Sequence, residues 1–230
     1  MIARGLIAFV TLAVCGTTGV ARTADLCRSG RAQSPVAITS DSLDTVALPP
    51  LRWHLGSVPL RLRNDGHTLR VRTGAGQYLV IGAERYKLTE VHFHTPGGDT
   101  LLSEEFPMAA HMLLRDARGR LLAVVLPMRL GDPNALLGVL LAHVPAHPGP
   151  DHDVVGASID LASFVPPPAR YYRYMGSLTA SPCTEGVPWL VLGTPASVSA
   201  VQLEQWKQHF ADNIRGPQPL HRRRVQQGPS

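Results

Sequence analysis

The 230-residue chain lacks the features that mark several large classes of protein. Aromatic residues make up only 6% of it and are not interleaved with the basic residues, which together with the lack of a nucleic-acid motif argues against a nucleic-acid partner. It has no internal repeat, and no low-complexity segment before the last few residues. The apolar run near the N-terminus is too short to span a bilayer, so no membrane span is expected.

Glycine and proline, by contrast, are abundant. The 21 glycines and 20 prolines are about 18% of the chain, against an average near 12%, which favours a turn-rich β architecture over a helical bundle. The length fits one substantial core, and nothing indicates a second domain. The formal net charge is +5, and the basic residues of the chain are scattered apart from 221–224. The net positive charge would modestly favour a small anionic ligand.

The first 21 residues have the pattern of a secretory signal peptide. Arg4 precedes an apolar run over 5–14, and small residues over 16–21 allow cleavage after Ala21. Residues 12–15 also resemble a lipoprotein cleavage box, but a bulky valine stands where that box needs a small residue. Lipidation is therefore the less favoured alternative.

Removal of the signal leaves two cysteines, Cys27 and Cys183, in an exported protein. The natural pairing is one disulfide that closes a loop of most of the domain, worth on the order of 4–5 kcal/mol in the chain-entropy model. We predict a domain over residues 22–225, a disordered tail over 226–230, and a periplasmic or secreted location.

Turn residues divide the mature chain into short segments with strand or helix patterns. A turn or bulge is expected over 64–67, and Gly74-Ala75-Gly76 is expected to close a hairpin between 69–72 and 78–81. The apolar segment 121–126 predicts a strand buried on both faces. Further strands are expected over 35–38, 60–69, 86–94 and 106–114, and helices over 134–143 and 197–210, the second capped by Ser197.

The segment Glu90-Val91-His92-Phe93-His94 carries the clearest indication of chemistry. In a strand His92 and His94 share one face, and if the strand over 106–114 pairs with it antiparallel, His111 reaches the same patch. Three imidazoles on one rigid face can hold Zn²⁺ and leave a fourth position open for a water. For a His-x-His pattern taken alone, a surface pair or a satisfied core feature is the alternative.

Further motifs occur in a fixed order between Cys27 and about residue 225. They are Gln33-Ser34-Pro35, Asn64-Asp65-Gly66-His67, His92-Phe93-His94-Thr95-Pro96, Phe106-Pro107 before His111, the run from Tyr172 to Thr179, Cys183-Thr184-Glu185-Gly186-Val187-Pro188-Trp189, and Asn213-Ile214-Arg215 with Gln218-Pro219-Leu220. Together they resemble the α-class carbonic anhydrase family, in the form of its bacterial exported members. The resemblance implies a mainly β (α+β) single domain on a large, mostly antiparallel twisted sheet with short surface helices.

The resemblance also implies a zinc ion at the floor of a conical cleft, held by His92, His94 and His111. It implies a lyase that reversibly hydrates CO₂ to bicarbonate and a proton, so the expected partners are these small molecules. Thr179 would orient a zinc-bound hydroxide that attacks CO₂. His67 would carry the product proton to buffer, which suits the unperturbed histidine pKa near 6.5.

Four further assignments come from the same resemblance. Leu178 and Trp189, joined by Val124 or a neighbour of it, would form the apolar wall of the substrate pocket. Glu90 would accept the spare ring N–H of a histidine ligand and fix its tautomer. The two cysteines at 27 and 183 match the family's disulfide.

The chain departs from the family at two supporting positions. Gly98 stands where the family has the glutamate that accepts from the threonine hydroxyl, and Asp99, Glu104 or Glu105 could replace it only if the loop is reshaped. Ala109 stands where a glutamate normally supports the third histidine. Loss of such supporting contacts typically costs about 10–100-fold in affinity or activity, so we expect zinc binding with reduced turnover.

These departures leave a second hypothesis open, a non-enzymatic or very slow relative that binds zinc or an anion. A zinc hydrolase of small esters is a third hypothesis, and a metal-free exported β domain is a fourth.

Overall fold

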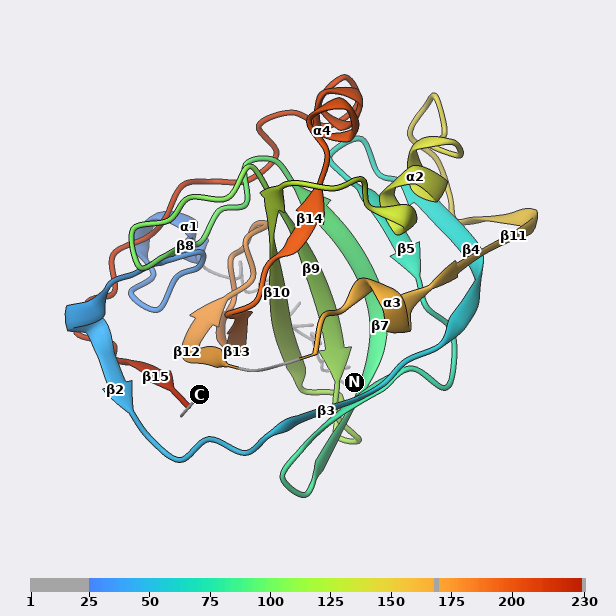
Figure 1. Ribbon diagram of the computed structural model, residues 1–230. Coiled ribbons are helices and arrows are strands. Elements are labelled where there is room, and N and C mark those ends of the chain that lie inside the picture. Colours follow the sequence, from blue (N-terminus) through green and yellow to red (C-terminus); the bar gives the residue numbers. More distant parts are fainter. Residues whose placement is uncertain (1–24, 168–169, 229–230) are drawn as a thin grey trace, which may run out of the picture.

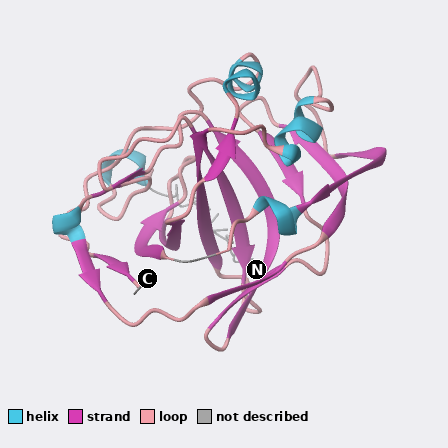
Figure 2. Ribbon diagram, viewed as in Figure 1, coloured by secondary structure: helices cyan, strands magenta, loops and turns pink. Residues whose placement is uncertain are grey.

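The computed structural model describes residues 25–167 and 170–228 of the chain (Figure 1). The predicted signal peptide lies outside this part. Strands dominate the described residues, and the helices are short and peripheral (Figure 2). Thirteen of these strands form one large twisted sheet, and β1 and β8 form a small parallel pair. The predicted mainly β architecture is confirmed.

The main sheet has the strand order β11-β4-β5-β7-β9-β10-β13-β12-β15-β2, with β6 beside β7, β3 beside β6, and β14 beside β10. Among the described strands of this sheet, parallel pairing occurs at β10–β13, β10–β14 and β15–β2, so the sheet is mixed but mostly antiparallel. The strands are β1 Ala37–Ile38, β2 Leu43–Thr45, β3 Leu51–His54, β4 Ser57–Asn64, β5 Leu69–Arg72, β6 Tyr78–Ile81, β7 Glu84–His94, β8 Thr100–Leu101, β9 Met108–Arg115, β10 Leu121–Leu130, β11 His152–Asp160, β12 Tyr171–Ser177, β13 Glu185–Leu192, β14 Ala196–Val198 and β15 Val225–Gln227.

The helical segments begin where a polar side chain can cap them. Asn134 accepts a hydrogen bond from the backbone N–H of Leu137 at 3.2 Å, and Asp160 caps the next helix in the same way. The segments are α1 Leu26–Ser29, the 3₁₀ turn η1 Ser40–Ser42, α2 Ala135–Leu141, α3 Leu161–Phe164 and α4 Ala200–Lys207.

The two faces of the central strands have different surroundings. Phe93 points to the side covered by α3 and α4, where its ring centroid lies 6.0 Å from that of Phe164 and 5.0 Å from that of Trp206. Its neighbours His92 and His94 point to the opposite side, because successive side chains of a strand alternate. Strand β10 is buried on both faces over most of its length, as its apolar pattern predicts.

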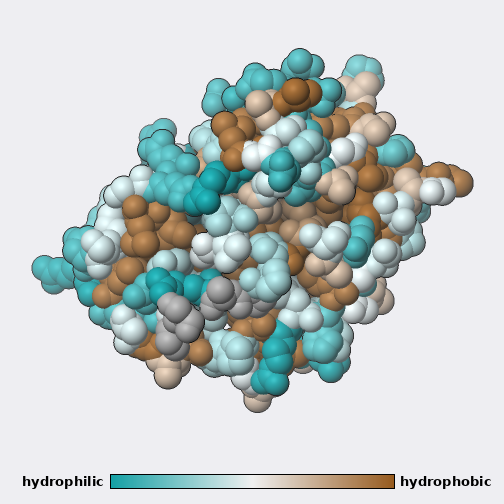
Figure 3. All heavy atoms as spheres, in the orientation of Figure 1, coloured by the Kyte–Doolittle hydropathy of each residue, from teal (hydrophilic) through white to brown (hydrophobic). Residues whose placement is uncertain are grey.

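The surface shown in Figure 3 has polar and apolar side chains interspersed rather than separated into two regions. No helix in the described part of the chain is long and apolar enough to cross a membrane.

The predicted hairpin around Gly74-Ala75-Gly76 is wrong. Strands β5 and β6 both pair antiparallel with β7, β5 beside residues 90–92 and β6 beside residues 84–87. They therefore run in the same direction, one after the other. The loop between them displaces the chain along β7 instead of reversing it.

Two predicted boundaries also need correction. Helix α4 is capped by Ser199, which accepts from the backbone N–H of Gln202 at 3.2 Å, whereas Ser197 lies in β14 and is held extended by pairing with β10. Gln226 and Gln227, predicted to be disordered, belong to β15 and are paired with β12 on one side and β2 on the other. Residues 229–230 of the predicted tail lie outside the described residues.

Candidate metal centre and its cleft

Strand register brings the three predicted histidines together. His92 of β7 lies directly opposite His111 of β9 in an antiparallel pair, and His94 follows two residues along β7 on the same face. One ligand nitrogen from each ring lies within 4.8 Å of the other two. The rings come from two adjacent central strands, so the backbone holds them rigidly.

Burial favours the neutral, metal-binding form of His94 and His111. It lowers the pKa of His94 to about 3, with the neighbouring His92 adding to the effect, and it lowers the pKa of His111 well below its usual value. The Nε2 atom of His94 is buried and has no hydrogen-bond partner among the described residues. Three converging imidazole nitrogens with an unpartnered buried atom fit a divalent metal such as Zn²⁺.

The outer nitrogens of the three rings have unequal partners. His94 Nδ1 lies 3.0 Å from the backbone oxygen of Asn213, which fixes its tautomer. His92 Nδ1 lies 3.1 Å from Glu90 Oε1, although the ring N–H is not aimed at that oxygen and forms no hydrogen bond in this geometry. His111 Nε2 is buried without a partner in the described chain, and Ala109 beside it on the same face has no group to offer.

Glu90 is itself held by two arginines. Nη1 of Arg70 bonds one carboxylate oxygen, and Nη1 of Arg72 bonds the other. Burial opposes ionisation of Glu90, but His92 and the two guanidinium charges together hold its pKa below the usual range. A negative charge is therefore maintained next to His92.

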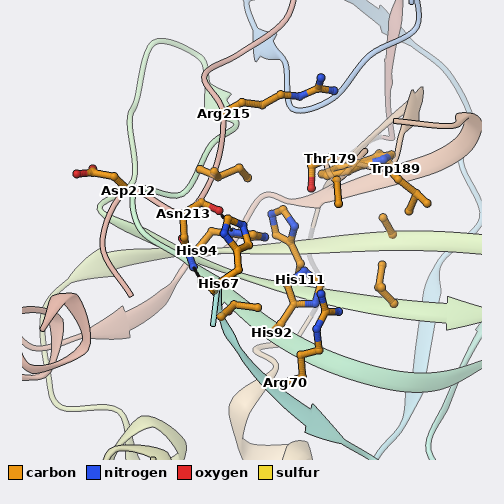
Figure 4. Close-up of a pocket in the computed structure, with 16 residues that line it drawn as sticks. His67, Arg70, His92, His94, His111, Thr179, Trp189, Asp212, Asn213 and Arg215 are labelled. Atoms are coloured by element: carbon orange, nitrogen blue, oxygen red, sulfur yellow. Dashed lines mark hydrogen bonds between the residues drawn. The ribbon is translucent and has the colours of Figure 1, made fainter. Parts of the chain in front are cut away.

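The histidines lie in a cleft of about 500 Å³ that opens to solvent. Leu178, Thr179 and Trp189 line it, as predicted, and Figure 4 shows Thr179 and Trp189 beside His111. Val124 does not line it, because its side chain points to the opposite face of β10 and is fully buried in the core there. The strand neighbour Ala123 lines the cleft instead.

The carboxylate expected to accept from Thr179 has no replacement in this loop. Gly98 has φ +88°, and a Cβ atom there would lie 2.7 Å from Cδ1 of Ile214, which fills the space. Asp99 accepts from the backbone N–H of Val36 and from the Tyr174 hydroxyl.

The other two candidate acids point elsewhere. Glu104 pairs with Arg129 at the surface, and Glu105 lies in a separate pocket beside Pro107. No acidic side chain of the described residues bonds the Thr179 hydroxyl.

His67 lies at the mouth of the cleft, in the turn between β4 and β5. Its ring is exposed, and its centroid lies 6.2 Å from that of His94 (Figure 4). Asp65 Oδ1 accepts from the backbone N–H groups of His67 and Thr68, and Gly66 takes a positive φ of 84°. These contacts of the turn thus fix the position of the His67 backbone at the mouth of the cleft.

The disulfide Cys27–Cys183 is present and lies behind the loop that carries Thr179. The N–H of Cys183 donates to the carbonyl of Ala180 at 2.8 Å, which closes this loop. Arg215, which also lines the cleft, donates from Nη1 to Cys183 Sγ at 3.4 Å. The disulfide therefore supports one wall of the cleft from outside.

Sequence reasoning did not single out Arg70 or Asn213 for a role in the cleft. Arg70 alternates with apolar neighbours in β5, a pattern that places it on one face but does not identify the strand beside it. Asn213 acts through its backbone oxygen, which no residue type specifies. For both, only the pairing of distant segments shows the contact.

Comparison with known proteins agrees with this geometry. The fold and the buried three-histidine centre define a β-sheet protein with a group of side chains in a cleft that could hold a metal ion. The sequence profile of the family described as eukaryotic-type carbonic anhydrase matches residues 20–228. The chain therefore belongs to the α-carbonic anhydrase family.

Relatives from bacteria support the enzyme class. A carbonic anhydrase of Pectobacterium atrosepticum is 35% identical over 200 residues, covering 86% of this chain and 80% of that protein. One from Neisseria gonorrhoeae is 33% identical over 204 residues, covering 87% and 79%. These relatives and the family match place the chain among the carbonic anhydrases, which are lyases.

Solved structures show the same fold. The α-carbonic anhydrase of Thermovibrio ammonificans, in complex with sulfanilamide, has a TM-score of 0.82 and 34% identity, covering 87% of this chain and 89% of that one. A dioscorin in complex with ascorbate has a TM-score of 0.79 and 29% identity, covering 88% and 87%.

Proposed function

We propose that the protein is an exported, zinc-dependent enzyme that hydrates CO₂ reversibly to bicarbonate and a proton. The observation that carries this proposal is the set of three buried imidazoles, whose ligand atoms lie within 4.8 Å of one another at the floor of an open cleft. His92, His94 and His111 would hold the metal. When bound, zinc supplies Lewis-acid chemistry that lowers the pKa of a water toward neutrality.

The chain's own residues would bind the substrate and orient the attack. Leu178 and Trp189 present apolar surface that suits uncharged CO₂ and excludes bulk water from it. The Thr179 hydroxyl has no partner within the described protein, so it is available to accept from or donate to a group above the histidines. Glu90 and the backbone oxygen of Asn213 would orient two of the ligand rings.

His67 would pass the product proton to buffer. Its ring is solvent-exposed and 6.2 Å from that of His94, a gap that water can bridge. Replacing it with alanine should lower the maximal rate by at least about tenfold at low buffer concentration, and imidazole buffer should restore part of the loss. His209 is also exposed but follows α4 and lines a different pocket, so His209→Ala is the control. An unchanged rate for His67→Ala at low buffer contradicts the shuttle role.

The function is tested by zinc analysis beside a stopped-flow CO₂ hydration assay on the mature protein. We expect about one zinc per chain and hydration above the buffer rate, and the loss of both in His111→Ala. His209→Ala again serves as the matched histidine control. Hydration at the buffer rate by fully zinc-loaded protein contradicts the proposal.

A second candidate function is favoured by one observation at Gly98. Ile214 fills the space of the expected carboxylate, so Thr179 lacks its usual acceptor. The same fold occurs in a dioscorin that was solved in complex with ascorbate, which supports considering a ligand other than CO₂. Under this alternative the protein binds zinc or an anion without fast turnover, and the hydration assay separates the two.

The disulfide supports an oxidising location, periplasmic or extracellular. Residues 1–21, the proposed signal peptide, would be removed on export, which mass measurement of the secreted protein can test.

A further inference from the structure

Arg70 shares a row of the sheet with the metal histidines. It lies opposite His92 in the β5–β7 pair, and His92 lies opposite His111 in the β7–β9 pair. Directly paired residues on adjacent strands point to the same face of a sheet. Register therefore places the side chain of Arg70 in the cleft wall beside the metal site, and Figure 4 shows it extending toward His92 and His111.

Two carboxylates fix the guanidinium of Arg70 without using all of its donors. Nε donates to Asp65 Oδ2, and Nη1 donates to Glu90 Oε1. Both N–H groups of Nη2 have no acceptor in the described part of the chain. The side chain is 28% exposed, so these donors are open to a ligand in the cleft.

Arg72 provides an internal comparison. It also donates from Nη1 to Glu90, and its Nε lies 3.1 Å from Asp151 Oδ2. Like Arg70, Arg72 is therefore held between two carboxylates, one of which is Glu90. Unlike Arg70, it does not line the cleft.

We propose that Arg70 is a bicarbonate-binding residue, with Nη2 donating to an oxygen of the anion in the cleft. This inference rests on the proposed function, because it assigns the product of that reaction. CO₂ is uncharged and suits the apolar wall at Leu178 and Trp189, whereas bicarbonate needs charge-assisted donors. Asp65 and Glu90 offset the charge of Arg70, so the contribution is a positioned hydrogen bond more than a long-range field.

The test compares Arg70→Gln with Arg72→Gln in the metal-loaded protein. Bicarbonate binding is measured from the visible spectrum of the cobalt(II)-substituted protein and, in the zinc form, from inhibition of CO₂ hydration by added bicarbonate. Arg70→Gln should weaken bicarbonate binding about five- to tenfold, the size of one charge-assisted hydrogen bond that is partly exposed. Arg72→Gln should weaken it less than about twofold, because Arg72 contacts Glu90 but not the cleft.

Equal weakening in the two variants overturns the inference, because the effect would then come from the charge on Glu90. Unchanged binding in Arg70→Gln also overturns it. If Arg70→Gln does not fold, Arg70→Lys keeps a charge for Asp65 and Glu90 but loses the planar donors, and should still weaken binding about threefold.

The cobalt spectrum separates failure of this inference from failure of the proposed function. Wild-type protein that binds bicarbonate but does not hydrate CO₂ contradicts the function and leaves the role of Arg70 open to the same comparison of variants.

Discussion

The two sides of the histidine cluster are supported in different ways. On the side of β5 and β7, His92 and His94 have Glu90 and the Asn213 oxygen at their outer nitrogens, and Glu90 has two arginines. On the side of β9, His111 Nε2 has no hydrogen-bond partner among the described residues, and Ala109 stands beside it. One side of the cluster is therefore held by a hydrogen bond at His94 and a charged neighbour at His92, and the other side by packing.

His111 is held by what surrounds its ring. Its centroid lies 4.4 Å from that of His94 and 5.3 Å from that of Trp189, and its backbone is fixed between β7 and β10. Close packing restricts a side chain even where no polar contact does. We infer that the missing partner affects the electronic character of this ligand more than its position.

Two carboxylates, Asp65 and Asp99, also differ in the polar support that they receive. Burial opposes ionisation of Asp65, but backbone N–H groups and the Arg70 guanidinium lower its pKa to about 2. Asp99 has no cationic partner within the described part of the chain, and burial raises its pKa to about 7 despite hydrogen bonds from Val36 and Tyr174. The counter-charge, not the depth of burial alone, decides which acid is ionised at neutral pH.

The largest expected effect is on the pH dependence of stability through Asp99. Folded Asp99 keeps its proton up to about pH 7, whereas the unfolded chain releases it near pH 3.8. The unfolded state binds fewer protons in this window, so the free energy of unfolding falls as pH rises from about 4 to 7 and then levels off. Asp99→Asn removes this loss. Its free energy of unfolding relative to the wild type, measured by urea unfolding, should rise by ~4 kcal/mol between pH 4 and pH 8.

Asp65→Asn is the matched control for that measurement. Asp65 has a lowered pKa, so its contribution is complete above about pH 4 and is lost as pH falls toward 2. The variant should be less stable by about 2 kcal/mol at every pH from 5 to 8, which gives a curve parallel to the wild type. If the free energy of unfolding of Asp99→Asn also runs parallel to that of the wild type across this pH range, Asp99 is ionised in the folded protein.

A smaller effect is expected from Asn213→Ala, on the supported side of the cluster. The Asn213 side chain accepts from the Thr95 N–H at 2.9 Å and donates to the carbonyls of His67 and Phe93, each at 3.0 Å. Truncation leaves a buried N–H unpaired and should lower the free energy of unfolding by about 2–3 kcal/mol. Because these side-chain hydrogen bonds hold the segment whose backbone oxygen lies 3.0 Å from His94 Nδ1, zinc affinity from chelator competition should fall in parallel.

Asn213→Asp, which keeps the acceptor but loses the donors, should give a loss of unfolding free energy that differs from that of Asn213→Ala. If neither variant changes stability or zinc affinity, hydrogen bonds on this side do no more than packing does at His111, and the contrast between the two sides disappears.

The smallest effect concerns Glu90. Glu90→Ala removes the carboxylate beside His92 and leaves Arg70 and Arg72 without a shared partner, so zinc affinity should fall about 10–100-fold. Glu90→Gln keeps an acceptor, so its zinc affinity should fall less than about tenfold. Equal affinities for wild type, Glu90→Gln and Glu90→Ala in chelator competition would mean that His92, like His111, depends on packing alone.

Much of the site could be predicted from local sequence pattern. The alternation of His92, Phe93 and His94 needs only the two-residue period of a strand, and the apolar run of β10 needs only burial on both faces. Val124 shows the limit of such reasoning: a shift of one residue along a strand moves a side chain to the other face, and only register fixes which neighbour lines the cleft.

The β character of the chain, the cysteine pair and the three histidines as candidate metal ligands could be predicted from the sequence, because they follow from chemistry and periodicity within short segments. Three other features became known from the three-dimensional fold: Arg70 lies beside His92, Ile214 fills the space at Gly98, and β5 and β6 share β7 instead of forming a hairpin. Each of these depends on which distant segments pair and pack, and contacts of that kind are set by the free energy of the whole fold.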